Sequence, residues 1–253
     1  MKTSSELKQL AKARLRGNFP ISISVIILQI LCLIPILFFS DLLQRNFNNY
    51  ALNFIYGTFT GLLINALSHL LSCGCQYFFL NLSRNRELKC SNLFFGFKNP
   101  DTFIISFLAT FIVQFIISLP INLIVYYLIR SNNISDAYSL LFYSQITIIL
   151  IFILTLFFTF GFIFINFIIM DNPNIPALEA VKMSWRMTKG QKLHILYITL
   201  SFIPLALLCV LTLGIGLLWL LPYVHTTTAF LYRDTIGELN PPNEYIQEEA
   251  NQF

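Results

Sequence analysis

Residues 141–169 read LFYSQITIILIFILTLFFTFGFIFINFII and contain no Lys, Arg, Asp or Glu. A helix needs about 20 apolar residues to cross the hydrocarbon core of a bilayer, so this stretch is long enough to span a membrane. Four further apolar segments lie at about 19–40, 54–80, 103–129 and 193–232. The chain is 56% hydrophobic and 11% charged, whereas soluble domains carry about 25% charged residues. These features exclude a soluble domain and indicate a helical membrane protein.

The last apolar segment is long enough for two spans and contains a natural break. Its residues Leu211-Thr212-Leu213-Gly214-Ile215-Gly216 include two glycines, which permit a tight reversal of the chain. We therefore expect separate spans at about 194–212 and 216–232. With the other four segments, this predicts an all-α, polytopic membrane helix bundle of about six transmembrane helices in a single domain, 1–233.

The basic residues are distributed as in a membrane protein of defined orientation. All but two of the 16 Lys and Arg residues lie at the start of the chain, in two interior loops or directly after the last apolar segment. Short cationic loops stay on the cytoplasmic side, so the pattern predicts an even number of spans with both termini in the cytoplasm. Residues 234–253 are rich in Asp and Glu around two prolines, and we expect them to form a short acidic cytoplasmic tail.

Each cytoplasmic segment predicts an amphipathic helix that ends near a glycine before the next span begins. In the first, an apolar stripe recurs at helical spacing before Gly17; in the last, Pro176 suits a helix start and Gly190 its end; the middle one, around Gly96, is weaker. Such helices lie in the headgroup layer, where their basic side chains meet anionic lipid. Alternatively, they are the solvated ends of bundle helices and need no ligand. The candidate headgroup contacts are Lys12, Arg16, Arg186 and Lys189.

The spans also carry neutral polar side chains in rows. Those of the second span advance by three or four residues from Gly61 to Gln76, and those of the third by four from Ser106 to Asn122, so each row shares a helix face. Such rows line a hydrated cavity or hold packed helices together, and packing is the preferred interpretation because no charged residue accompanies them. In the last span, Pro222 frees a backbone carbonyl that the following threonines are expected to satisfy. The candidate cavity or interhelix residues are Asn65, His69, Gln76, Gln114, Asn122 and His225.

Sequence signatures of catalysis and metal binding are missing. The chain has no Gly-rich phosphate loop, no His-Glu-x-x-His and no Gly-x-Ser-x-Gly. Cys73 and Cys75 have only His69 nearby, which is too few ligands for a metal site. We therefore expect no enzymatic activity, no catalytic residues, no cofactor, no metal and no nucleic-acid partner.

Several motifs are similar to those of a known group of proteins. They are Ala13-Arg14-Leu15-Arg16-Gly17-Asn18, Phe95-Gly96-Phe97, Asp171-Asn172-Pro173 and, near the end, Leu211-Thr212-Leu213-Gly214-Ile215-Gly216-Leu217-Leu218-Trp219 with Pro222-Tyr223. In these motifs the chain resembles, nearly end to end, the bacterial integral membrane proteins catalogued as domain of unknown function nine-seventy-five. It departs from their pattern in lacking a proline beside Gly161. The resemblance implies a multi-span bacterial membrane protein, and the family has no established activity or catalytic residues to transfer.

We therefore expect a non-enzymatic accessory or organising component of the bacterial cytoplasmic (inner) membrane. Its expected partners are the lipid bilayer, through anionic headgroups on the cytoplasmic side, and a membrane protein. The alternative hypothesis is a permease-like transporter or a lipid-handling protein that uses the polar faces of the second and third spans.

Overall fold

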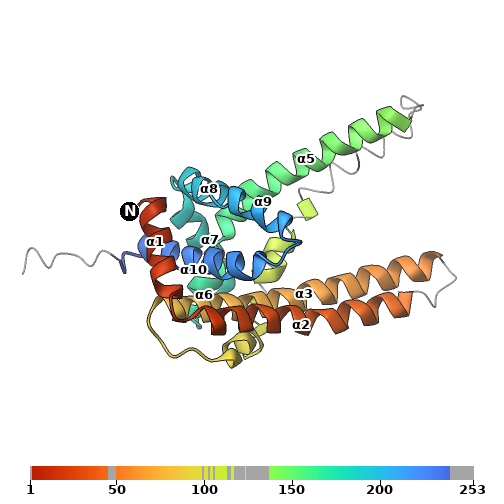
Figure 1. Ribbon diagram of the computed structural model, residues 1–253. Coiled ribbons are helices and arrows are strands. Elements are labelled where there is room, and N and C mark those ends of the chain that lie inside the picture. Colours follow the sequence, from red (N-terminus) through yellow and green to blue (C-terminus); the bar gives the residue numbers. More distant parts are fainter. Residues whose placement is uncertain are drawn as a thin grey trace, which may run out of the picture. The chain divides into compact units, whose positions relative to one another are not determined.

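The computed structural model describes residues 2–44, 50–98 and 137–239, together with scattered positions between 100 and 123. Helices form most of this part of the chain, and no strand occurs in it (Figure 1). The all-helical fold class is therefore confirmed for these residues. The elements are α1 (Ser4–Leu15), α2 (Phe19–Gln44), α3 (Tyr50–Ser83), η1 (Cys90–Phe97), α5 (Ala137–Phe162), α6 (Ile165–Asp171), α7 (Ala177–Thr188), α8 (Lys192–Leu200), α9 (Ile203–Leu211) and α10 (Leu217–Thr235).

Three helical stretches in the described residues are long and apolar enough to cross a membrane: Phe59–Ser83, Gln145–Asp171 and Lys192–Leu211. A fourth is added if α1 and Phe19–Pro35 of α2, which meet at 94°, are counted as one broken span. The expected third span, at 103–129, lies largely outside the described residues. Among the described residues, the structure thus confirms three or four helical stretches suited to a membrane, and the six spans expected from the sequence stay a prediction.

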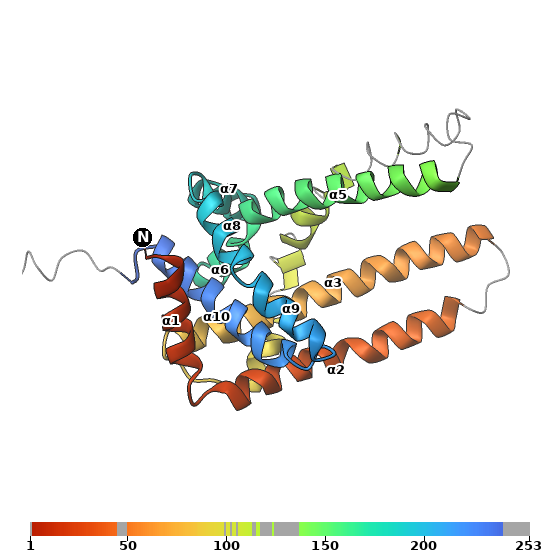
Figure 2. The same ribbon diagram turned by 45° about the horizontal axis from the view of Figure 1, so that its top comes forward.

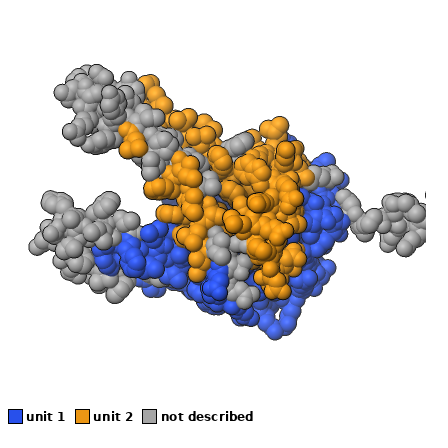
Figure 3. Space-filling model, turned by 180° about the vertical axis from the view of Figure 1, so that it is seen from behind, with its two compact units in different colours: residues 1–103, 197–253 blue, residues 104–196 orange. Residues whose placement is uncertain are grey.

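The chain divides into two compact units (Figure 3). Unit 1 comprises residues 1–103 and 197–253, and unit 2 comprises residues 104–196. Segments far apart in the sequence thus come together in unit 1, where α1, α2 and α3 pack with α10. The single domain expected over 1–233 stays a prediction.

In unit 1, α2 and α3 lie side by side as a long hairpin, and α1 lies across one end of it (Figures 1 and 2). The start of α1 has a capping box, in which Thr3 Oγ1 accepts the N–H of Glu6 and the Glu6 carboxylate accepts the N–H of Thr3. Of its apolar stripe, Leu7, Ala11 and Leu15 are fully buried and Leu10 is exposed, and α1 packs against α10 and α3. Most of the apolar face of this amphipathic helix is therefore covered by protein.

The middle cytoplasmic segment differs from the expected amphipathic α-helix. It forms a 3-10 helix, η1, that packs along α3. The two backbones approach so closely that a Cβ on Gly74 would overlap the carbonyl group of Leu93, so only glycine fits at this position of α3. The rings of Tyr77 and Phe95 stack beside this contact, with their centroids 3.8 Å apart.

The span expected at 194–212 is broken at Ser201 and Phe202, between α8 and α9. Pro204 lies in the first turn of α9. It has no N–H to donate, and its ring would clash with the carbonyl of Leu200 if the helix continued without a break. α8 therefore ends at Leu200, and α9 begins at Ile203 with the proline in its first turn.

The reversal predicted at Leu211–Gly216 is confirmed, because α9 ends at Leu211 and α10 begins at Leu217. The N–H of Gly214 donates to the carbonyl of Cys209 (2.9 Å), and that of Leu213 donates to the carbonyl of Val210 (3.1 Å). This pair of bonds is a Schellman motif, in which the residue after the helix cap takes a left-handed conformation. Here that residue is Leu213, with φ of 52°.

α10 continues through Pro222, and its threonines do not repair the helix in the way the sequence predicts. The carbonyl that the proline frees belongs to Leu218, one turn earlier. The Thr226 hydroxyl donates instead to the carbonyl of Pro222 (2.7 Å), and Thr227 and Thr228 likewise bond one turn back. The prediction was wrong because a threonine hydroxyl reaches only the carbonyl three or four residues before it.

Unit 2 holds α5, α6 and α7. The amphipathic helix expected between Pro176 and Gly190 is confirmed as α7. On the face where the sequence places Ala177, Ala180, Val181, Ser184 and Trp185, Ala180 and Ser184 are fully buried and Val181 and Trp185 are half-buried. Ser184 Oγ donates to the carbonyl of Gly161 in α5 (2.8 Å). The Trp185 ring occupies the place where a Cβ on Gly161 would lie, so this glycine admits the indole.

Candidate functional site

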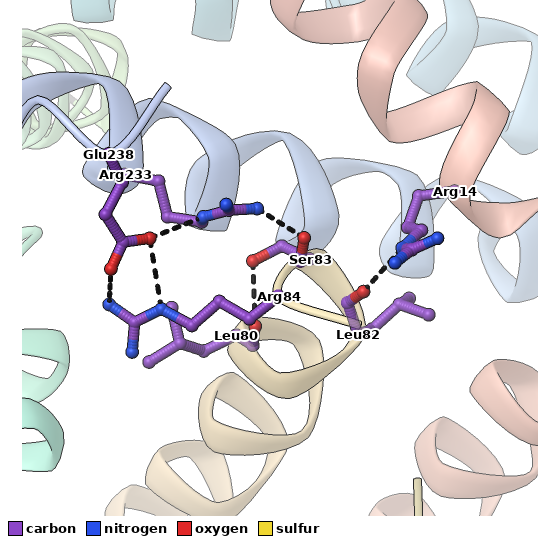
Figure 4. Close-up of polar contacts among 7 residues, drawn as sticks. All are labelled: Arg14, Leu80, Leu82, Ser83, Arg84, Arg233 and Glu238. Atoms are coloured by element: carbon purple, nitrogen blue, oxygen red, sulfur yellow. Dashed lines mark hydrogen bonds and ion pairs between the residues drawn. The ribbon is translucent and has the colours of Figure 1, made fainter. Parts of the chain in front are cut away.

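Two arginines of unit 1 bind the C-terminal end of α3 (Figure 4). Arg14 Nε donates to the carbonyl oxygen of Leu82 (2.8 Å), and Arg233 donates to the carbonyl oxygen of Ser83. The last carbonyls of a helix lack intrahelical partners and carry the negative end of its dipole, so a guanidinium stabilises them. These two cations hold α1 and α10 to α3 and are not free to bind a ligand.

Glu238 joins two of the basic residues to each other. Its carboxylate accepts hydrogen bonds from Arg84 (2.6 Å) and Arg233 (2.6 Å). Burial by itself raises the pKa of Glu238, but the hydrogen bonds and the positive charges of Arg84 and Arg233 outweigh it, and the net pKa is lowered. The carboxylate therefore stays charged within this cluster.

The four candidate headgroup residues are placed differently from Arg14 and Arg233. Lys12 and Arg16 of α1, Arg186 of α7 and Lys189 after it are all exposed. Within the described part of the chain, no residue forms a hydrogen bond or ion pair with any of these four side chains. Their charges are therefore available to an external anion.

An apolar cavity of 470 Å³ lies beside Lys12 in unit 1. Its volume is within the range of about 300–1,000 Å³ that is usual for ligand pockets. Most of its wall comes from α9, α10 and the turn between them, and Lys12 is the one charged residue that lines it. The lining residues are Lys12, Phe19, Leu205, Leu208, Cys209, Thr212, Gly216, Trp219, Leu220 and Tyr223.

Unit 2 has a cavity of similar chemistry beside α7. It measures 570 Å³ and is lined by Phe162, Val181, Lys182, Trp185 and Arg186. Aromatic rings thus lie next to two exposed basic residues of the amphipathic helix. In both units an apolar wall adjoins a cation, an arrangement that suits an amphiphile with an anionic group.

Asn65, His69, Gln76 and His225, the polar candidates that the structure describes, do not line either of these cavities. Asn65 is exposed and donates to the carbonyl of Gly61 in its own helix (2.8 Å). His69 is half-buried on the same helix. His225 of α10 stacks on the Phe79 ring of α3, with the ring centroids 5.3 Å apart.

Gln76 is half-buried on α3. Its side chain is not without a partner in the structure. Gln114 and Asn122 lie outside the described residues. The choice between a hydrated cavity and helix packing therefore stays a prediction for the row of the third span.

Sequence reasoning did not single out Trp219 and Tyr223 as cavity residues. Their signal is the spacing of four residues, which places both on one face of α10. The other half of the wall, from α9, could not be found this way, because the position of α9 beside α10 depends on the turn between them.

An all-helical chain with three or four stretches suited to crossing a membrane, and with cations beside apolar cavities, belongs to the class of proteins compatible with membrane insertion. Residues 1–238 match the family described as "Protein of unknown function (DUF975)", and the chain belongs to this family. No curated protein and no solved structure matches the chain. The match reaches Glu238, the residue that joins Arg84 to Arg233.

Proposed function

We propose that the protein is a non-enzymatic accessory or organising component of the bacterial cytoplasmic membrane that binds anionic headgroups through its basic helices. The observation that supports this most directly is the set of free cations on and just after α1 and α7. Lys12, Arg16, Arg186 and Lys189 are exposed and have no partner among the described residues. Each basic residue near an anionic bilayer surface contributes about 1 kcal/mol of attraction.

The basic residues also support an orientation with both termini in the cytoplasm, which requires an even number of crossings. The apolar segments at 19–40, 54–80, 103–129 and 141–169 supply four. Two more would complete the six expected from the sequence if the last apolar segment crossed the bilayer twice.

The proposed function is tested by purifying the full chain in nanodiscs that contain phosphatidylglycerol and recording native mass spectra of what stays bound. A protein partner in fixed stoichiometry supports an accessory role. A retained polar solute without any protein partner supports the transporter hypothesis instead and contradicts the proposal.

A variant with Lys12, Arg16, Arg186 and Lys189 changed to Gln should retain less phosphatidylglycerol than the unmodified chain. Its matched control changes Lys2, Arg86, Lys89 and Lys98 to Gln, which removes the same charge from positions that line neither of the two cavities. Equal loss in both variants would show that lipid binding depends on net charge and not on the four candidate residues.

A further inference from the structure

We propose that α9 and α10 form a re-entrant hairpin, which enters the membrane from the cytoplasmic side and returns without crossing it. Its turn, Leu211–Leu217, would lie among the acyl chains of the cytoplasmic leaflet. The inference rests on the proposed cytoplasmic position of α1. In this arrangement, the re-entrant hairpin takes the place of the fifth and sixth crossings expected from the sequence.

α10 is much shorter than α3. Both helices have one end at the same place, because Arg233 of α10 bonds the carbonyl of Ser83, the last residue of α3. From there α10 extends over 19 residues and α3 over 34, which correspond to about 28 Å and about 51 Å. Figures 1 and 2 both show the α2–α3 hairpin continuing well past the α9–α10 turn. The turn therefore stops well short of the far end of α3.

The residues that directly precede α9 contact α1. Lys8 of α1 donates through Nζ to the carbonyl of Ser201 (3.2 Å) and lies over the ring of Phe202, 4.2 Å from its centroid. These two residues directly precede α9, so this helix begins at the level of the basic helix α1. Of the 20-residue stretch Lys192–Leu211, only the nine residues of α9 follow this point, and they measure about 14 Å, roughly half of the 30 Å hydrocarbon core.

The cavity of unit 1 leads to the same conclusion independently of helix lengths. One cavity of 470 Å³ is lined both by Lys12 of α1 and by Thr212 and Gly216 of the turn. A turn on the outer surface would be separated from a cytoplasmic lysine by the whole hydrocarbon core, about 30 Å. The turn therefore lies on the same side of the bilayer centre as Lys12.

The surface and the hydrogen bonds of the turn suit hydrocarbon. Leu211, Leu213 and Ile215 are 79%, 94% and 61% exposed. Irregular backbone is tolerated in a bilayer only where its polar groups find partners, and the Schellman bonds described above meet that condition. In addition, the Thr212 hydroxyl donates to the carbonyl of Cys209 (3.0 Å) and accepts the N–H of Gly216 (3.0 Å). The turn thus presents apolar side chains outward and keeps these polar groups paired.

The test places a cysteine at position 213 or 48 of a full chain that carries Cys90→Ser, so that Cys90 adds no label, and measures its reaction with a maleimide that cannot cross membranes. Leu213→Cys removes an exposed side chain, so protection of the new thiol would come from lipid. Asn48→Cys, between the first two apolar segments, is the control for the outside, and the native Cys90 of the unmodified chain, which is exposed, is the control for the cytoplasmic side. Intact cells report the outside, and inverted vesicles report the cytoplasmic side.

We expect Asn48→Cys to react in intact cells, Cys90 to react in inverted vesicles, and Cys at position 213 to react in neither until detergent and denaturant are added. Reaction at position 213 in intact cells would show a full crossing and overturn the proposal. Reaction in inverted vesicles as fast as that of Cys90 would show a hairpin outside the bilayer and overturn it equally. If Asn48→Cys reacts only in inverted vesicles, the proposed orientation fails, while protection of position 213 from both sides would still support re-entry.

A second measurement covers the case in which the cysteine variant does not fold. Leu213→Trp, with Trp185→Phe and Trp219→Phe, leaves a single tryptophan in the turn. Lipids brominated on their acyl chains should quench its fluorescence more strongly than acrylamide in water does. Stronger quenching by acrylamide would contradict burial of the turn in hydrocarbon.

Discussion

Arg14 donates a hydrogen bond from Nε to the carbonyl oxygen of Leu82, 2.8 Å away, and so connects α1 to the last turn of α3 (Figure 4). Two residues later, directly after the end of α1, Arg16 is exposed and has no partner among the described residues. Two arginines that look equivalent in the sequence therefore differ in role, one binding the helix end and the other facing outward.

Arg14→Met should lower the free energy of unfolding by about 1.5–3 kcal/mol, because it removes a hydrogen bond from a charged donor and leaves the carbonyl of Leu82 without this partner. Thermal unfolding of the purified chain in detergent measures the change. Arg16→Met is the matched control and should change stability by less than about 0.5 kcal/mol. Equal destabilisation by both would contradict a specific role for Arg14.

Glu238 should make stability depend on pH. The pKa of Glu238 in the folded protein lies below its ordinary value of 4.5, because the hydrogen bonds and charges of Arg84 and Arg233 outweigh the opposing effect of burial. Its contribution to stability is therefore fully present above about pH 4.5 and is lost as the pH falls through the lower folded pKa.

The measurement is the melting temperature of the unmodified chain and of Glu238→Gln between pH 7 and pH 3. The variant should be less stable at pH 7, and the difference should shrink as the pH falls below 4.5. Glu87→Gln, which alters an exposed ion pair with Lys89, is the control and should change little. A difference between Glu238→Gln and the unmodified chain that is constant with pH would contradict the assignment.

Gly74→Ala should destabilise unit 1 by about 1–3 kcal/mol, because the added Cβ meets the backbone of Leu93, which cannot rotate away as a side chain would. Gly61→Ala is the control on the same helix. A Cβ there meets nothing within 4 Å, so this change should be neutral or stabilise the helix by up to about 1 kcal/mol. Thermal unfolding in detergent compares the two, and similar losses would argue against the close packing of η1 on α3.

Leu213→Gly should stabilise the chain, since the residue has a positive φ of 52° and is 94% exposed. A left-handed conformation costs a residue with a Cβ about 1–2 kcal/mol, which glycine avoids. The neighbouring Leu211 is also exposed but lies in α9, so Leu211→Gly should destabilise by about 1 kcal/mol. The expected result is thus opposite signs for two nearby Leu→Gly changes in the unfolding temperature.

Local features of this protein were determined by the sequence alone. The helical class follows from apolar runs such as 141–169, the reversal between α9 and α10 follows from Gly214 and Gly216, and the buried face of α7 follows from the spacing of Ala180 and Ser184. Each of these depends on residues within a few turns of one another, so periodicity and turn chemistry suffice to predict it.

The roles of individual cations and the path of the last apolar segment were decided only by tertiary structure. Charge alone does not separate Arg14 from Arg16, because the difference lies in the distance of each from Leu82, which is far away in the sequence. Hydropathy alone does not show whether α9 and α10 cross a membrane. Their depth depends on Arg233 bonding to Ser83 and on Lys8 bonding to Ser201, and contacts between residues so distant in the chain leave no periodic signal in it.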